Sequence, residues 1–160
     1  MAKVIQNEQN IVVEPWWVKG NIVYVGLGAG LLWWVFTTIL RLYIVEPIAC
    51  RDLSTAATCV NAVGVSGSIA AALIAAVGIF LLVHFSQPRP IIISAATAAV
   101  LWNLGSMMDG IAWYFVVLWA LLFYAVSYSL FSLVARIPRV WVSLVTAGVI
   151  VGGVRLLLAL

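Results

Sequence analysis

The sequence contains very little charge for its length. Only 8% of its 160 residues are Asp, Glu, Lys or Arg, whereas 66% are hydrophobic. A soluble protein of this size must expose much of its surface to water, and this composition cannot supply a polar surface of that extent. The basic residues are scattered, so the basic cluster of a nucleic-acid surface is missing. We therefore predict a membrane protein that does not bind nucleic acid.

The chain also has few of the groups that membrane-embedded enzymes use. Two cysteines and one histidine are too few for a thiol relay or a zinc site. We find no HExxH or CxxC motif and no paired carboxylates, and the middle of each apolar run lacks Asp, Glu, Lys, Arg and His. We therefore expect no enzymatic activity, no cofactor and no metal site.

Long apolar runs are what the sequence has in abundance. About 20 helical residues cross a hydrocarbon core of roughly 30 Å, and continuous runs favour helices over a transmembrane barrel. The sequence predicts an all-α, polytopic membrane bundle that forms a single domain, residues 1–160. Its five predicted spans are residues 20–44, 61–85, 90–108, 111–135 and 140–160. The third is barely long enough, so four spans with a re-entrant segment are the alternative.

The residues on either side of the first apolar run indicate where its helix begins and ends. Residues 1–19 are expected to form a short tail at the membrane surface, with Trp16 and Trp17 among the lipid headgroups. Glu46 and Pro47 are expected to end the first helix, because proline disrupts a helix interior.

The only two cysteines, Cys50 and Cys59, lie in the connection between the first two runs. On an oxidising side they are expected to form a disulfide, which in so short a loop stabilises by about 2–3 kcal/mol; in the cytosol both remain thiols.

Positively charged residues set the predicted orientation, because short cytoplasmic loops hold more Lys and Arg. The predicted N-terminal side carries five, and the other side three: Lys3, Lys19, Arg89, Arg136 and Arg139 against Arg41, Arg51 and Arg155. We predict a bacterial-type cytoplasmic membrane with the N-terminus inside and the C-terminus outside. The cysteine loop then lies outside, which favours the disulfide.

Small residues recur at spacings that place them on one helical face. The second run has two such stripes, Gly64, Ser68, Ala72 and Ala76 beside Gly67, Ala71 and Ala75. Such faces let helices approach closely, so we expect this helix at the centre of the bundle. Gly26, Gly28 and Gly30 in the first run are interpreted in the same way. The Gly148 and Gly152 pair, a GxxxG pattern, can pack within the bundle or between copies.

A few polar side chains are candidates for a site. Asn103, Tyr124, Ser127 and Tyr128 are grouped as a possible polar or ligand-binding face, although interhelical hydrogen bonding and ordinary packing explain the same residues. Asp109 is expected to cap the N-terminus of the fourth helix, because its carboxylate accepts the free amide hydrogens there. A cation-binding or protonatable carboxylate is the alternative for Asp109, but no second acid is nearby.

Three functions remain open. The first is a non-catalytic subunit, anchor or assembly partner of a membrane complex, which contacts the lipid bilayer and either a protein partner or a second copy. The second is an oligomeric channel or carrier for small solutes, lined by the polar face. The third is a lipid- or quinone-binding protein that uses the aromatic fourth helix with Arg136 and Arg139.

Overall fold

The structure is a computed structural model, and it describes residues 16–51, 59, 61–85, 87 and 89–159. No strand occurs in these ranges, which confirms the all-α prediction. The helical segments are α1 (Trp16–Leu40), the π-helix η1 (Arg41–Val45), α2 (Glu46–Ala49), α4 (Ala62–His84), α5 (Pro90–Val100), α6 (Leu104–Met107), α7 (Trp113–Ala135) and α8 (Val140–Ala159).

The helices are those of a membrane protein. Four segments of the described chain are long and apolar enough to cross a membrane, Ile22–Ile48, Ala62–His84, Pro90–Met107 and Trp113–Ala135. The last helix contributes a shorter apolar stretch, Val140–Leu156. These stretches correspond to the five predicted spans.

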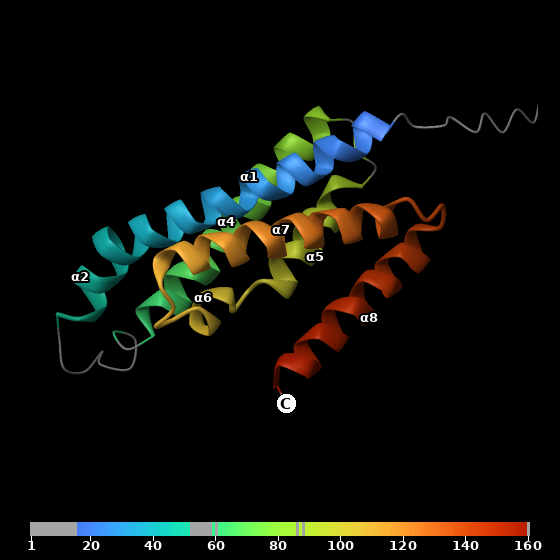
Figure 1. Ribbon diagram of the computed structural model, residues 1–160. Coiled ribbons are helices and arrows are strands. Elements are labelled where there is room, and N and C mark those ends of the chain that lie inside the picture. Colours follow the sequence, from blue (N-terminus) through green and yellow to red (C-terminus); the bar gives the residue numbers. More distant parts are fainter. Residues whose placement is uncertain (1–15, 52–58, 60, 86, 88, 160) are drawn as a thin grey trace, which may run out of the picture.

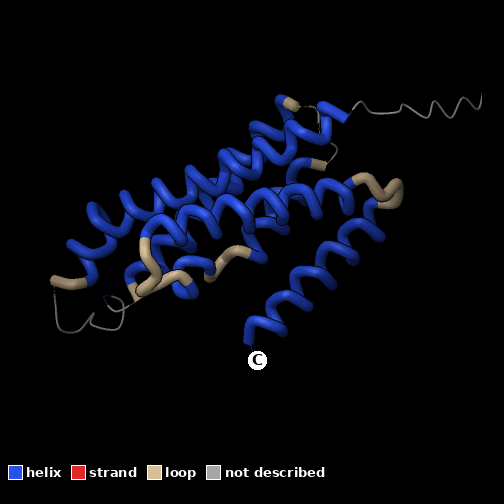
Figure 2. The backbone as a smooth tube through the Cα atoms, viewed as in Figure 1, coloured by secondary structure: helices blue, strands red, loops and turns tan. Residues whose placement is uncertain are grey.

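Four segments form a closed ring of neighbours. Helix α1 contacts α4 and α7, and α5 contacts the same two helices from the other side. Helix α8 packs outside this ring against α5 and α7, and it leaves α7 at an angle (Figure 1). Figure 2 shows the same arrangement as a backbone tube. The prediction that the second span lies at the centre is therefore wrong, because α4 is one side of the ring.

The most extensive contact between two helices is that of α1 with α7, and glycines make this close approach possible. A Cβ atom at Gly26 would lie 2.6 Å from the Ala125 Cα, and one at Gly30 would lie 2.7 Å from the Ala120 carbonyl oxygen. Helix backbones therefore touch at both positions. Gly28 does not contact α7, and no atom of another described residue lies within 4 Å of its Cβ position.

The interior of the ring is filled by large side chains joined by a few hydrogen bonds. Trp33, Tyr124 and Tyr128 are almost fully buried there. The Trp33 Nε1–H donates to the Gly67 carbonyl at 2.9 Å, so α1 and α4 are joined by a polar contact as well as by packing.

The two small-residue stripes of α4 differ in their surroundings. Gly67 and Ala71 are buried, whereas Ala72 and Ala76 are exposed. Gly64 is buried, Ser68 and Ala75 are partly buried, and the Ser68 hydroxyl reaches the third span. Half of the first stripe, Ala72 and Ala76, thus faces away from the bundle.

The first helix does not end at Glu46 and Pro47 as predicted. The helix continues through the π-helix η1 into α2 and ends at Ala49. Proline lacks an N–H and clashes with the carbonyl four residues before it, and one wider turn removes that clash. In this turn the Glu46 N–H donates to the Arg41 carbonyl, five residues back. At its other end α1 begins at Trp16 rather than at residue 20, and residues 1–15 of the predicted tail lie outside the described residues.

Two contacts join the connections between helices. The structure contains a disulfide between Cys50 and Cys59, whose Cα atoms are 5.0 Å apart. At the other end of the bundle, Arg89 adopts a left-handed backbone conformation with φ of 54°. Its guanidinium donates to the carbonyls of Ile137 and Pro138, at 2.6 and 2.8 Å. Arg89 therefore joins the start of α5 to the turn between α7 and α8.

Candidate functional site

The third predicted span is broken into α5 and α6, and this break positions the candidate site. Residues 101–103 form a turn between the two helices. A Cβ at Gly105 would lie 2.6 Å from the Val63 carbonyl, so α6 sits directly on the backbone of α4. The Ser68 hydroxyl shares its single proton between the Gly64 carbonyl of its own helix, at 2.9 Å, and the Trp102 carbonyl, at 2.8 Å, which the turn leaves without its helical partner. Contacts with α4 therefore hold the interrupted helix in place.

Arg155 of α8 closes the end of α5. Its Nε and Nη2 both donate to the Ala99 carbonyl, at 3.1 and 2.6 Å. The last carbonyls of a helix lack intrahelical partners and carry partial negative charge, so a cation is favourable there. Among the described residues this is the hydrogen-bonded link between α8 and the broken span.

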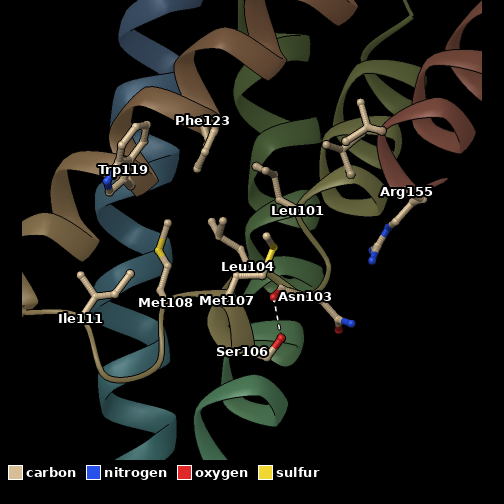
Figure 3. Close-up of a pocket in the computed structure, with 12 residues that line it drawn as sticks. Leu101, Asn103, Leu104, Ser106, Met107, Met108, Ile111, Trp119, Phe123 and Arg155 are labelled. Carbon is tan, nitrogen blue, oxygen red and sulfur yellow. Dashed lines mark hydrogen bonds between the residues drawn. The ribbon is translucent and has the colours of Figure 1, made fainter. Parts of the chain in front are cut away.

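A cavity of about 630 Å³, which we call the α8 cavity, lies beside this contact. Most of its lining is apolar, and three polar residues contribute at one side. The lining residues are Val100, Leu101, Asn103, Leu104, Ser106, Met107, Met108, Ile111, Trp119, Phe123, Val154 and Arg155. Figure 3 shows Trp119 and Phe123 of α7 on one side and Arg155 of α8 on the other, with α6 between them. This arrangement offers an apolar chamber with a cation at its edge.

The polar side of the α8 cavity lies at the end of the bundle where α6 turns into α7. Ser106 donates to the Asn103 carbonyl at 2.9 Å, a bond drawn in Figure 3. Ile111, in the turn that follows α6, lines the same cavity as Arg155. Turns between spans lie at the membrane surface, because backbone without helical bonds is costly in hydrocarbon. The chamber is therefore apolar toward the membrane interior and polar toward the surface.

A second cavity, of about 260 Å³, lies between α1 and the turn before α7. Both Arg41 and Asp109 line it, so it contains charges of both signs. The Thr37 Oγ1 is buried beside it with no hydrogen-bond partner in the described chain. A guanidinium in the same cavity weakens the case for Asp109 as a cation-binding carboxylate.

The predicted cap at Asp109 is wrong. Helix α7 begins at Trp113, its N-cap residue is Ala112, and no side chain caps it. The chain reverses through Gly110, whose φ is 79°, before the helix can start. The Ala112 carbonyl then accepts the first helical bonds, from Phe115 and Val116. Asp109 precedes that turn, too early in the chain to be the N-cap.

The predicted polar face does not exist as one surface. Tyr124 and Tyr128 are each 1% exposed and point into the ring, where Tyr128 lies 3.3 Å from the Ser94 hydroxyl oxygen. Asn103 is exposed and lines the α8 cavity, and Ser127 is partly buried. The tyrosines pack because α7 turns that side into the ring, with Tyr124 against α1 and Tyr128 against α4 and α5. Asn103 instead lies in the break of the third span. These residues share no pathway within the described chain.

Sequence reasoning did not single out the residue that matters most at the α8 cavity. From the sequence alone, Arg155 enters only the predicted membrane orientation, although it follows a long apolar run. An arginine in such a place signals a polar partner nearby, because an unpaired charge in hydrocarbon is costly. A second signal was the shortness of the third span, with Asn103 and Gly105 near its end.

Comparison with protein families, with curated proteins and with solved structures finds no match for this chain. The geometry of the α8 cavity and of the helix surfaces is therefore the ground for a functional proposal.

Proposed function

We propose that this protein is a non-catalytic membrane protein that holds an amphiphile in the α8 cavity. An amphiphile has an apolar tail and a polar head, and the cavity offers a surface for each. Its volume of about 630 Å³ falls within the roughly 300–1,000 Å³ of small-molecule sites, and its walls are apolar apart from Asn103, Ser106 and Arg155. This combination of size and lining is the observation that carries the proposal.

The lipid-binding hypothesis drawn from the sequence invokes an aromatic helix and a cation, and the α8 cavity offers both, but with a different cation. The fourth predicted helix contributes Trp119 and Phe123, as its aromatic content suggested. The cation comes from Arg155, whereas Arg136 and Arg139 lie in the turn at the opposite end of α7. The non-catalytic part of the proposal is supported by the sequence, whose spans carry no acid, base or thiol at their centres.

Filling the cavity tests the proposal. Val154→Trp adds a large side chain to the lining, whereas Val142→Trp adds the same side chain on the exposed face of α8. Native mass spectrometry of protein purified in mild detergent is expected to show a retained lipid-sized molecule in the wild type and in Val142→Trp, and its loss in Val154→Trp. Wild-type protein without a retained molecule, or equal retention in both variants, would contradict the proposal.

A second candidate is the subunit or assembly partner drawn from the sequence, and the outer face of α8 favours it. Gly148 and Gly152 are exposed, and no atom of another described residue lies within 4 Å of their Cβ positions. Gly26 and Gly30, by contrast, are already in contact with α7. A GxxxG face without a neighbour can receive a helix of another chain or of a second copy.

The assembly proposal is tested by the mass of the complex in mild detergent. Replacement of both Gly148 and Gly152 by leucine is expected to release the partner or to dissociate the oligomer. Gly28→Leu is the matched control, since Gly28 also has open space at its Cβ but lies on α1. An unchanged mass in the double variant would reject the α8 face as an interface.

The orientation also remains a proposal, with the N-terminus inside a bacterial-type cytoplasmic membrane. The excess of Lys and Arg on that side supports it, and the Cys50–Cys59 bond fits an oxidising outer side. Labelling of intact cells with a membrane-impermeant thiol reagent is expected to require prior reduction. Labelling that occurs only after cell lysis would place the cysteine loop inside and reverse the orientation.

A further inference from the structure

The charge of Arg155 is only partly satisfied by the protein. Two of its three nitrogens share one neutral acceptor, the Ala99 carbonyl, and Nη1 makes no hydrogen bond with the described residues. The single ion pair among those residues joins Arg41 to Glu46, so no described carboxylate neutralises Arg155. Charges at membrane level are normally paired, because hydrocarbon does not solvate them.

The contact with the end of α5 explains why a hydrogen-bond donor is present at position 155, but not why that donor is a guanidinium. A carbonyl oxygen accepts from one or two donors, and a hydroxyl or an amide side chain would satisfy it. A guanidinium brings in addition a permanent charge and a planar set of donors that matches phosphate oxygens. Because Nε and Nη2 are anchored on Ala99, the group is held with one nitrogen still available at the polar edge of the α8 cavity.

The surroundings of Arg155 fit a lipid better than a soluble anion. The apolar part of the cavity is continuous with exposed aromatic side chains of α7, Trp119 and Phe123, which are 44% and 37% exposed. In a membrane such surfaces face acyl chains. One chain of a phospholipid can therefore enter between α7 and α8 while the other stays in the bilayer.

We infer that the α8 cavity is a site for an anionic phospholipid, with one acyl chain against Leu104, Met107 and Phe123 and the phosphate at the Arg155 guanidinium. The inference rests on the proposed amphiphile-binding function and adds that the headgroup of the bound molecule is negatively charged. The occupant is drawn from the surrounding leaflet, so no soluble delivery step is needed. Ser106 and the Asn103 amide lie at the same polar edge, where glycerol and headgroup oxygens would be placed.

The test compares two phospholipids with the same acyl chains, one with an anionic headgroup and one with a zwitterionic headgroup. Delipidated full-length protein in detergent is incubated with equal amounts of phosphatidylglycerol and phosphatidylcholine with the same acyl chains, and bound lipid is counted by native mass spectrometry. Wild-type protein is expected to prefer phosphatidylglycerol about tenfold, because both lipids carry a phosphate but the choline ammonium of phosphatidylcholine offsets its charge near the guanidinium. Arg155→Gln is expected to bind both lipids equally, and Arg155→Lys to keep part of the preference.

Arg139→Gln is the matched control, because it removes one exposed positive charge from the turn that precedes α8, at the end opposite Arg155. Its preference should equal that of the wild type. A wild-type protein that binds both lipids equally, or an Arg155→Gln variant that keeps the preference, overturns the charge inference and leaves amphiphile binding standing. Binding of neither lipid overturns both proposals. Displacement of phosphatidylglycerol by an equal amount of oleate would identify a fatty acid as the occupant and also overturn the inference.

Discussion

The α1–α7 pair and helix α8 differ in how they are held to the rest of the bundle. At Gly26 and Gly30 the backbones of α1 and α7 touch, so the pair is fixed by close packing along its length. On α8 the glycines face outward, and arginine contacts with backbone carbonyls lie near its two ends. Lipid tails are as apolar as leucine, so side-chain hydrophobicity alone does not hold helices together. This looser attachment of α8 accounts for the larger of the two cavities described above, which lies beside α8.

The largest expected effect lies in the tight pair. Gly30→Leu should prevent normal packing of α1 on α7, because even its Cβ would lie 2.7 Å from the Ala120 carbonyl. We expect a loss of about 3 kcal/mol or more. Fluorescence-detected size-exclusion chromatography after heating measures the melting temperature. Gly28→Leu on the same helix should melt like the wild type, and equal losses in both variants would show that the close approach is not what matters.

The next effect concerns the hydrogen bond across the ring. Trp33→Phe removes the Nε1–H that donates to Gly67 at 2.9 Å in a buried site, and should destabilise by about 1–2 kcal/mol. The same heating experiment measures this loss. Trp34→Phe is the control, since Trp34 is only partly buried. A Trp33→Phe variant as stable as its control would mean that packing of the ring, rather than the indole N–H, stabilises this contact.

A smaller effect is expected at the N-terminal end of α8. Arg89→Gln removes the bonds to the Ile137 and Pro138 carbonyls and should cost about 1 kcal/mol, while loosening the position of α8. Spin labels at two exposed positions, Val126 on α7 and Val145 on α8, report this position. The distance distribution between them should broaden.

Arg139→Gln is the control for the variant at Arg89, because Arg139 is exposed in the same turn. It should leave the distance distribution unchanged. An unchanged distribution in Arg89→Gln itself would show that α8 is positioned by its packing on α5 and α7.

The smallest effect on the fold is expected on the outer face of α8. Gly148→Leu should change the free energy of unfolding by less than about 0.5 kcal/mol, because open space surrounds its Cβ. The melting temperature of the monomeric fraction measures this. A loss as large as that of Gly30→Leu would mean that α8 is packed as tightly as α1, and the contrast between the two regions would disappear.

The sequence was sufficient for the parts of the fold that depend on local composition. Long apolar runs predict the helices. Of the three glycines interpreted as packing positions, Gly26 and Gly30 contact α7, whereas the interpretation is wrong for Gly28, which has open space at its Cβ within the described chain. The partner helix could not be predicted, because glycine spacing says that a neighbour comes close without saying which one. The same limit explains the wrong central place given to α4.

The break in the third span and the α8 cavity depend on contacts between distant residues. Gly105 lies on the Val63 carbonyl, and Ser68 supports the Trp102 carbonyl. Neither contact leaves a periodic signal in the sequence, so a continuous helix was expected. Asp109 was misplaced for a related reason, since the turn at Gly110 delays the start of α7. Arg155 acquires its role only when the end of α5 is brought beside α8.

The π-helix η1 also has an electrostatic consequence. Side chains five apart lie on different sides of an α-helix, but a wider turn brings them nearer to one another, and the Arg41 Nε lies 2.6 Å from the Glu46 carboxylate. The apolar stretch that includes η1, Ile22–Ile48, has 27 residues and is about 40 Å long, more than the roughly 30 Å of hydrocarbon. Such a helix tilts or extends past the lipid tails. Arg41 and Glu46 neutralise one another. The end of the helical stretch that carries them can therefore change its depth in the bilayer without moving an unpaired charge into hydrocarbon.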